Sequence, residues 1–97
     1  MSKIQAIIMA SNDNTATVVE SISPNSDVQL DNAGNRISVH VIEQIPFGHK
    51  FAIKTIAKGD SIVKYGESIG IASQNIAIGQ HVHVHNMEST RGRGDKT

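Results

Sequence analysis

The stretch IPFGHKFAIKTIAKGDSIVKYGESIGIASQNIAIGQHV, residues 45–82, decides the fold. It repeats one pattern: an Ile, two residues, a Gly or Asn, two residues and an apolar residue. The copies are IPFGHKF at 45, IAKGDSI at 56 and IAIGQHV at 76, and a fourth, ISPNSDV, begins at 22. Their spacings of 23, 11 and 20 residues are too irregular for a solenoid. Each copy is typical of a strand end, a tight turn and re-entry into a new strand. The pattern predicts a compact, barrel-like body of short, bent strands.

The composition also favours strands. The 97 residues suffice for one domain with a modest core, and they contain fourteen Ile and eight Val but one Leu. Side chains branched at Cβ are stiff and suit a pleated surface, whereas helical cores usually depend on Leu. We therefore predict a mainly β fold.

Charge and cysteine content exclude several function classes. Nine basic residues balance nine acidic ones, so no strong field would attract nucleic acid or an anionic membrane. Cysteine is absent, which excludes disulfides and thiolate metal sites. No segment reaches the length of a membrane span, and we expect a cytoplasmic location. A small chain without disulfides is often completed by a partner or by a homo-oligomer.

Turn residues divide the first half of the chain into strands. The loop DNAGN, residues 31–35, predicts a hairpin in which Gly34 can take a positive φ. The segment 46–55 mixes two periodicities and is the one place where we expect a helical turn. The expected strands are residues 4–10, 16–22, 28–30 and 36–43.

The chain changes character after Asn86. Residues 87–97 contain one apolar residue, two glycines and five charges. We therefore expect a folded domain over residues 1–86 and a polar tail over 87–97 that is mobile alone or docks on a partner.

Three histidines stand two apart in HVHVHN. If His81, His83 and His85 lie on a strand, their rings share one face at spacings of about 7 Å, and Val82 and Val84 take the buried face. Imidazoles at such spacing can bind a divalent metal. The same face could bind a sugar acid, and a polar strand face can also carry histidines without any ligand.

Two further motifs offer weaker candidates. In GHK, His49 and Lys50 provide an acid–base group and a cation for a carboxylate, although a solvated loop also accounts for them. In VKYG, Lys64 and Tyr65 should point to opposite faces of a strand, with Tyr65 packed. We interpret His40 as structural.

The run IPFGHKFAIKTIAKGDSIVKYGESIGIASQNIAIGQHVHVHN resembles the altronate dehydratase family. The motifs GHKFA, IxKGDxIxKYGExIG and IAxGxHVHVHN stand in the family's order, and the resemblance extends over residues 13–95. It implies a SAF-type β-clip fold, which in this family precedes a large lyase domain. The small subunit of sulfolactate sulfo-lyase is similar. The initial Met and the polar tail favour a separate small subunit over a truncated chain.

The resemblance implies a reaction. A sugar-acid hydro-lyase of this type removes water by β-elimination from an aldonic acid and yields a 2-keto-3-deoxy acid. A divalent metal, iron or manganese in related enzymes, assists. We expect a composite site shared with a large lyase subunit and a small chain that is inactive alone. The alternatives are the small subunit of a sulfo-lyase and a β-clip module that binds sugar acids without chemistry.

The resemblance also implies site residues through the GHK and HVHVHN motifs. The expected catalytic groups are His49, Lys50, His83 and His85. The expected substrate contacts are Lys50, His81 and Asn86. The expected metal ligands are His81, His83 and His85.

Overall fold

The computed structural model describes residues 4–8, 10–32 and 34–89. Within these residues the chain forms nine strands and no helix, which confirms the mainly β prediction. No helix long and apolar enough to cross a membrane occurs among them. The strands are β1 (Ala6–Ile8), β2 (Thr15–Val18), β3 (Ser26–Asn32), β4 (Asn35–Val41), β5 (Lys50–Ala52), β6 (Ser61–Lys64), β7 (Glu67–Ala72), β8 (His81–Val82) and β9 (Met87–Ser89).

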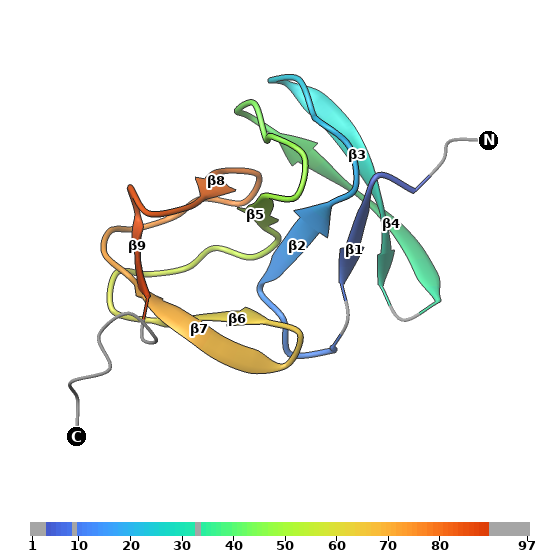
Figure 1. Ribbon diagram of the computed structural model, residues 1–97. Coiled ribbons are helices and arrows are strands. Elements are labelled where there is room, and N and C mark those ends of the chain that lie inside the picture. The colour runs from blue at the N-terminus through green and yellow to red at the C-terminus, as the bar shows by residue number, and fades with distance from the viewer. Residues whose placement is uncertain (1–3, 9, 33, 90–97) are drawn as a thin grey trace.

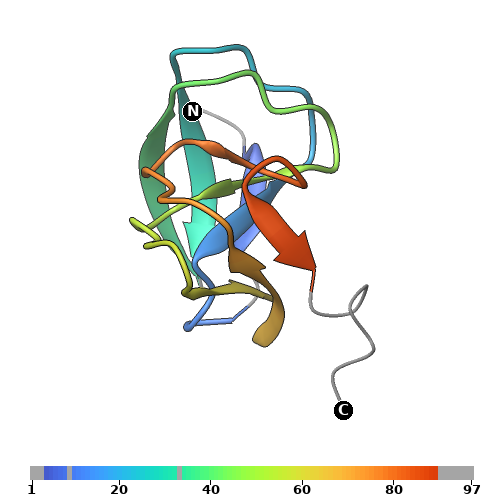
Figure 2. The same ribbon diagram turned by 90° about the vertical axis from the view of Figure 1, so that its left-hand side faces the viewer.

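The strands form two sheets. The larger sheet has the order β4-β3-β1-β2-β5-β8, and the smaller has the order β6-β7-β9. The pair β1–β3 is parallel, and the other pairs are antiparallel. The β3–β4 hairpin lies at one end of the molecule and the smaller sheet at the other, with β1, β2 and β5 between them (Figure 1). Figure 2 turns the end with β9 toward the viewer.

The isoleucines that begin the repeated pattern pair with one another. Ile22 and Ile45 form one isolated antiparallel bridge, and Ile56 and Ile76 form another. In each bridge both backbone N–H groups donate to the partner's carbonyl at 2.8–2.9 Å. All four side chains are at most 3% exposed. The copies of the repeated pattern are therefore paired through their first residues, and each pair places two stiff isoleucine side chains in the core.

The fourth residue of each copy turns the chain. Its φ is positive in every copy: 59° at Asn25, 82° at Gly48, 94° at Gly59 and 86° at Gly79. Gly and Asn tolerate this conformation better than other residues. At Gly79 a Cβ atom would also collide with the backbone oxygen of His40. The predicted tight turns are confirmed.

Apolar side chains gather in two clusters. The first core cluster contains the fully buried Leu30 and Phe51. The second core cluster joins Val82 of β8 to Ile62 of β6, and so connects the two sheets. The first comprises Ala6, Ile8, Ala16, Val18, Ile22, Val28, Leu30, Val39, Val41, Ile45 and Phe51. The second comprises Ala52, Ile56, Ile62, Ala72, Ile76 and Val82.

Three polar residues at the start of β2 fasten the larger sheet to the β6–β7 hairpin. The buried carboxylate of Asp13 accepts a hydrogen bond from the N–H of Gly66 at 2.7 Å. The Asn14 amide accepts from the N–H of Val63 at 2.8 Å, and the Thr15 hydroxyl donates to the carbonyl of Val63 at 3.0 Å. These bonds fix where the hairpin lies.

Three sequence predictions can be compared directly with the structure. The expected helical turn within 46–55 is wrong: Lys50–Ala52 instead form β5, because β2 and β8 pair with its two edges. Gly34 has a φ of 89° in the β3–β4 loop, as predicted. Met87–Ser89, placed in the polar tail by the sequence, form β9 against β7. Residues 90–97 of the expected tail lie outside the described residues.

Candidate functional site

The strand that carries the histidines is shorter than predicted. β8 ends at Val82, and a turn follows in which the N–H of Asn86 donates to the carbonyl of His83 at 3.0 Å. Val82 is fully buried, as expected, but Val84 is 77% exposed. The predicted alternation therefore stops at His83, because a turn does not keep the two-residue period of a strand.

Asn86 organises this turn from inside. It is fully buried, its Nδ2 donates to the carbonyl of His81 at 2.8 Å, and its Oδ1 accepts from the N–H of His83 at 3.0 Å. Sequence analysis predicted a substrate contact here. The structure instead gives both amide atoms to the backbone of the histidine segment, so Asn86 positions the rings and presents no surface to a ligand.

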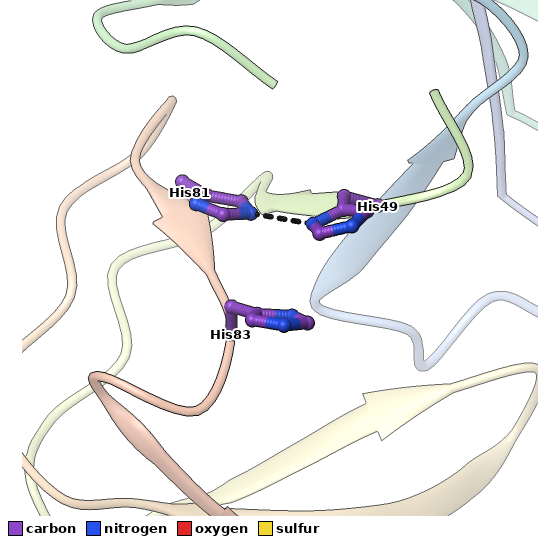
Figure 3. Close-up of side chains that lie close together, drawn as sticks. All are labelled: His49, His81 and His83. Atoms are coloured by element: carbon purple, nitrogen blue, oxygen red, sulfur yellow. Dashed lines mark hydrogen bonds between the residues drawn. The ribbon is translucent and has the colours of Figure 1, made fainter. Parts of the chain in front are cut away.

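Three imidazoles from two segments converge. His49 comes from the turn before β5, and His81 and His83 come from β8 and the residue after it. Nδ1 of His49 lies 3.0 Å from Nε2 of His81 (Figure 3). The His83 ring stacks on that of His49, with centroids 4.5 Å apart and planes 23° apart. The rings of His81 and His83 are almost parallel, 8° apart. These residues form the histidine cluster.

His85 does not belong to the histidine cluster. Its side chain is exposed, and its ring is tilted by 40° from that of His81 at a centroid distance of 5.3 Å. It forms a second group with His81 and Glu43, a residue that sequence analysis did not single out. Of the three predicted ligands, the structure therefore groups His81 and His83 with His49, and places His85 with His81 and Glu43.

The local environment favours the neutral forms of His81 and His83. Burial, followed by the charges of neighbouring histidines, lowers the pKa of His81 to about 4. Burial and then His49 also lower the pKa of His83. Beside the cluster, burial and the charge of Lys64 lower the pKa of the Lys50 ammonium. Neutral imidazoles bind metals, and an amine with a lowered pKa is more often in the free form that accepts a proton.

The histidine cluster brings together three nitrogens that can bind a metal, and the stacked His83 ring would have to turn its nitrogen toward an ion held by the other two. One nitrogen from each of His49, His81 and His83 lies within 4.8 Å of the other two. Two nitrogens bonded to one metal at about 2.1 Å are about 3.0 Å apart when the bonds are perpendicular and about 3.4 Å apart in a tetrahedron. The 3.0 Å between His49 and His81 falls within this range.

Thr17 is a further candidate that sequence reasoning missed. It lies directly opposite Lys50 in the β2–β5 pairing, so the two side chains share a face. Its buried hydroxyl has no hydrogen-bond partner among the described residues. Only the strand pairing reveals this neighbour. By contrast, His40 lies outside the histidine cluster and contacts Asp27 at 2.9 Å on the exposed surface.

Comparison with known proteins gives a consistent result. The family model for the altronate/galactarate dehydratase SAF domain matches residues 4–90. Altronate dehydratase of Bacillus subtilis is 53% identical over 53 residues, 55% of this chain, and that of Escherichia coli is 40% identical over 74 residues, 76% of this chain. The alpha subunit of (2R)-sulfolactate sulfo-lyase from Paracoccus pantotrophus is 39% identical over 64 residues, 66% of this chain.

The matches differ in how much of each relative they span. They cover 11% of the Bacillus subtilis dehydratase and 14% of the Escherichia coli one. They cover 92% of the Paracoccus pantotrophus alpha subunit. This chain therefore corresponds to a small part of the dehydratases and to nearly the whole of that sulfo-lyase subunit.

Proposed function

Since this chain belongs to the altronate/galactarate dehydratase SAF domain family, we propose that it is the small module of a sugar-acid hydro-lyase. It would form a composite active site with a large lyase subunit, and together they would remove water from an aldonic acid. The suspected family is confirmed, and its named members are dehydratases and lyases. The reaction, the partner and the roles below are our proposal for this chain.

One observation carries the proposal: groups suited to this elimination meet at a single place. The histidine cluster joins His49, from one motif, to His81 and His83, from another motif more than thirty residues away. Lys50 follows His49 directly and lies opposite the hydroxyl of Thr17. An amine, a hydroxyl and imidazoles together suit a substrate with an acidic C–H group and several hydroxyl groups.

The elimination can be written for these groups. Lys50, as the free amine, takes the proton from the carbon next to the carboxylate, and the electron pair of that C–H bond forms a carbon–carbon double bond. The C–O bond at the β carbon breaks, and its hydroxide leaves as water with a proton from His85. The resulting enol takes up a proton at the β carbon and becomes the 2-keto-3-deoxy acid. The lowered pKa of Lys50 and the exposed position of His85 support these roles.

We also propose that the histidine cluster holds a divalent cation. When bound there, the cation would act as a Lewis acid toward the carboxylate of the substrate. Three imidazole donors suit iron better than manganese, which prefers oxygen ligands. His49, His81 and His83 would be its ligands from this chain, and His85 would remain available for proton transfer.

A sulfo-lyase is the second candidate. The match over 92% of a sulfo-lyase alpha subunit supports it, because that relative is a separate chain of similar extent. The 53% identity to the Bacillus subtilis altronate dehydratase, above the 42% and 39% to the two sulfo-lyase subunits, supports the hydro-lyase. Both candidates use the same site and need a large partner.

A graft tests the proposal. This chain would replace the matching segment of the Bacillus subtilis altronate dehydratase, and the product would be assayed with Fe²⁺ for keto-acid release from D-altronate and sulfite release from (2R)-sulfolactate. We expect keto acid from the graft and no turnover by the chain alone. His83→Ala should reduce activity at least about 100-fold, and His40→Ala should leave it unchanged. Three results would contradict the proposal: turnover by the chain alone, no product from either substrate, or equal effects of the two substitutions. Release of sulfite without keto acid from D-altronate would favour the sulfo-lyase.

A further inference from the structure

The turn between β6 and β7 has an unusual residue at its first position. Lys64 and Glu67 are paired, and the two residues between them have positive φ values, 55° for Tyr65 and 79° for Gly66. Such two-residue turns favour Asn-Gly, because Asn and Gly tolerate this conformation. A tyrosine there costs about 1–2 kcal/mol relative to glycine. The other non-glycine residue with positive φ among the described residues is Asn25, which suits its turn.

Packing does not explain the tyrosine. Tyr65 is 48% exposed, so its burial offsets the backbone strain only in part and about half of the residue remains open to a ligand. The backbone of the turn is nevertheless fixed, because Gly66 donates to the buried Asp13 carboxylate and Val63 donates to Asn14. A strained residue in a rigid, exposed turn indicates a functional role for its side chain.

A cavity of about 460 Å³ lies beside this turn, within the size range of ligand sites. Ile69 and Met87 give it an apolar side, since both pack against the second core cluster. The ammonium of Lys64 lies 5.0 Å from the centroid of the Tyr65 ring. The lining residues are Lys64, Tyr65, Glu67, Ile69, Met87 and Ser89.

The chemistry of this lining suits a hydroxylated carbon chain. The Tyr65 phenol, the Glu67 carboxylate and the Lys64 ammonium can all hydrogen-bond hydroxyl groups. The ring of Tyr65 and the apolar side formed by Ile69 and Met87 can contact the C–H groups between those hydroxyls. A purely apolar ligand would leave the polar groups unpaired.

The cavity is connected to the histidine cluster through the chain and through strand pairing. Met87 directly follows Asn86, whose amide holds the histidine segment. Lys64 directly follows Val63, whose carbonyl accepts a hydrogen bond from β2, the strand that also pairs with Lys50. The chain and β2 thus connect the cavity to the proposed reaction site.

We propose that this cavity binds the hydroxylated carbon chain of the acid substrate and that Tyr65 determines specificity for it. The inference rests on the proposed function, which places the carboxylate of the substrate at the histidine cluster and its α carbon beside Lys50. It adds a binding subsite on β6, β7 and β9 and predicts a preference for long polyhydroxy acids over short ones. Sulfolactate has no hydroxylated chain with which to fill the cavity.

The test compares two substrates in the grafted dehydratase. D-altronate has the full hydroxylated chain, whereas L-glycerate, which has the same configuration at the α carbon, has only the α hydrogen and β hydroxyl that the elimination requires. Tyr65→Asn suits the turn, so we expect a stability equal to or above that of the parent and a fall of at least tenfold in kcat/KM for D-altronate, with kcat/KM for L-glycerate unchanged. Asn25→Tyr is the matched control, because it places a tyrosine at a strained turn away from the cavity lining; it should lower stability and leave the ratio of the two kcat/KM values unchanged.

The outcomes separate the two proposals. If the parent graft converts D-altronate and Tyr65→Asn leaves its kcat/KM unchanged, or lowers both kcat/KM values equally, the cavity inference is wrong and the proposed function stands. If the parent graft converts neither acid, the proposed function fails and the inference fails with it. Tyr65→Phe gives a second check: it keeps the ring and should lose less activity on D-altronate than Tyr65→Asn.

Discussion

Replacing Asn86 by Ala tests whether one buried amide holds the histidine cluster together. The side chain is fully buried and makes two hydrogen bonds, to the carbonyl of His81 at 2.8 Å and from the N–H of His83 at 3.0 Å. Leaving a buried backbone group without its partner costs about 1–3 kcal/mol. Asn86→Ala should therefore lower the free energy of unfolding by about 2–5 kcal/mol, a large share of the ~5–15 kcal/mol typical of a small domain.

Asn86→Asp is a second variant. It keeps an oxygen for the N–H of His83 but at pH 7 buries a negative charge against the carbonyl of His81. We expect it to destabilise at least as much as Asn86→Ala. Both variants should weaken binding of Co²⁺ at least tenfold, because the rings of His81 and His83 lose their fixed separation.

The measurements are direct. The chain lacks Trp and has one Tyr, so urea unfolding is best followed by circular dichroism, and Co²⁺ binding by visible absorption. Asn75→Ala is the matched control, because the Asn75 amide accepts a single bond, from the N–H of Lys58 at 2.9 Å, on the exposed surface. It should cost less than about 1 kcal/mol and leave Co²⁺ binding intact. Equal stability of the Asn86→Ala and Asn75→Ala variants, or undiminished Co²⁺ binding by Asn86→Ala, would refute the reasoning.

Three further predictions concern the cluster and the turns. Burial and neighbouring charges lower the pKa of His81 to about 4, so the folded state disfavours protonation of this ring. The free energy of unfolding should therefore be highest above the unfolded pKa near 6.5 and should fall as the pH drops toward 4. In urea titrations at several pH values, His81→Gln should flatten this dependence. His49→Ala should abolish tight Co²⁺ binding while His40→Ala retains it, and calorimetry showing equal affinities would exclude His49 as a ligand. Gly59→Ala should cost about 1–2 kcal/mol from its positive φ alone. Gly79→Ala should destabilise more, because its Cβ meets the backbone of His40; similar midpoints in thermal unfolding would show that the backbone yields there.

The repeated pattern predicted the turns because it depends on local chemistry. A Gly or Asn at the fourth position tolerates a positive φ wherever the chain later goes, and Gly48, Gly59 and Gly79 all adopt it. The sequence did not show that the isoleucines of the pattern pair as Ile22 with Ile45 and Ile56 with Ile76. That pairing depends on long-range backbone hydrogen bonds, which a local pattern does not encode.

For the candidate site, the sequence predicted which residues take part but not how they are grouped in space. The histidines of GHK and HVHVHN stood out from residue type and spacing alone. Their grouping was not predictable from strand alternation, because β8 ends at Val82 and the buried Asn86 bends the next residues into a turn. That turn leaves His85 outside the cluster and brings His83 against His49.

By itself the sequence determined the β character of this protein, its tight turns and its family resemblance, since these follow from side-chain branching, backbone freedom at Gly and Asn, and motifs contiguous along the chain. Tertiary structure alone decided which imidazoles meet, that Thr17 lies beside Lys50, and that Tyr65 is held strained at the edge of a cavity. These features join residues far apart in the chain, and their positions are set by strand pairing and by buried polar groups such as Asp13 and Asn86.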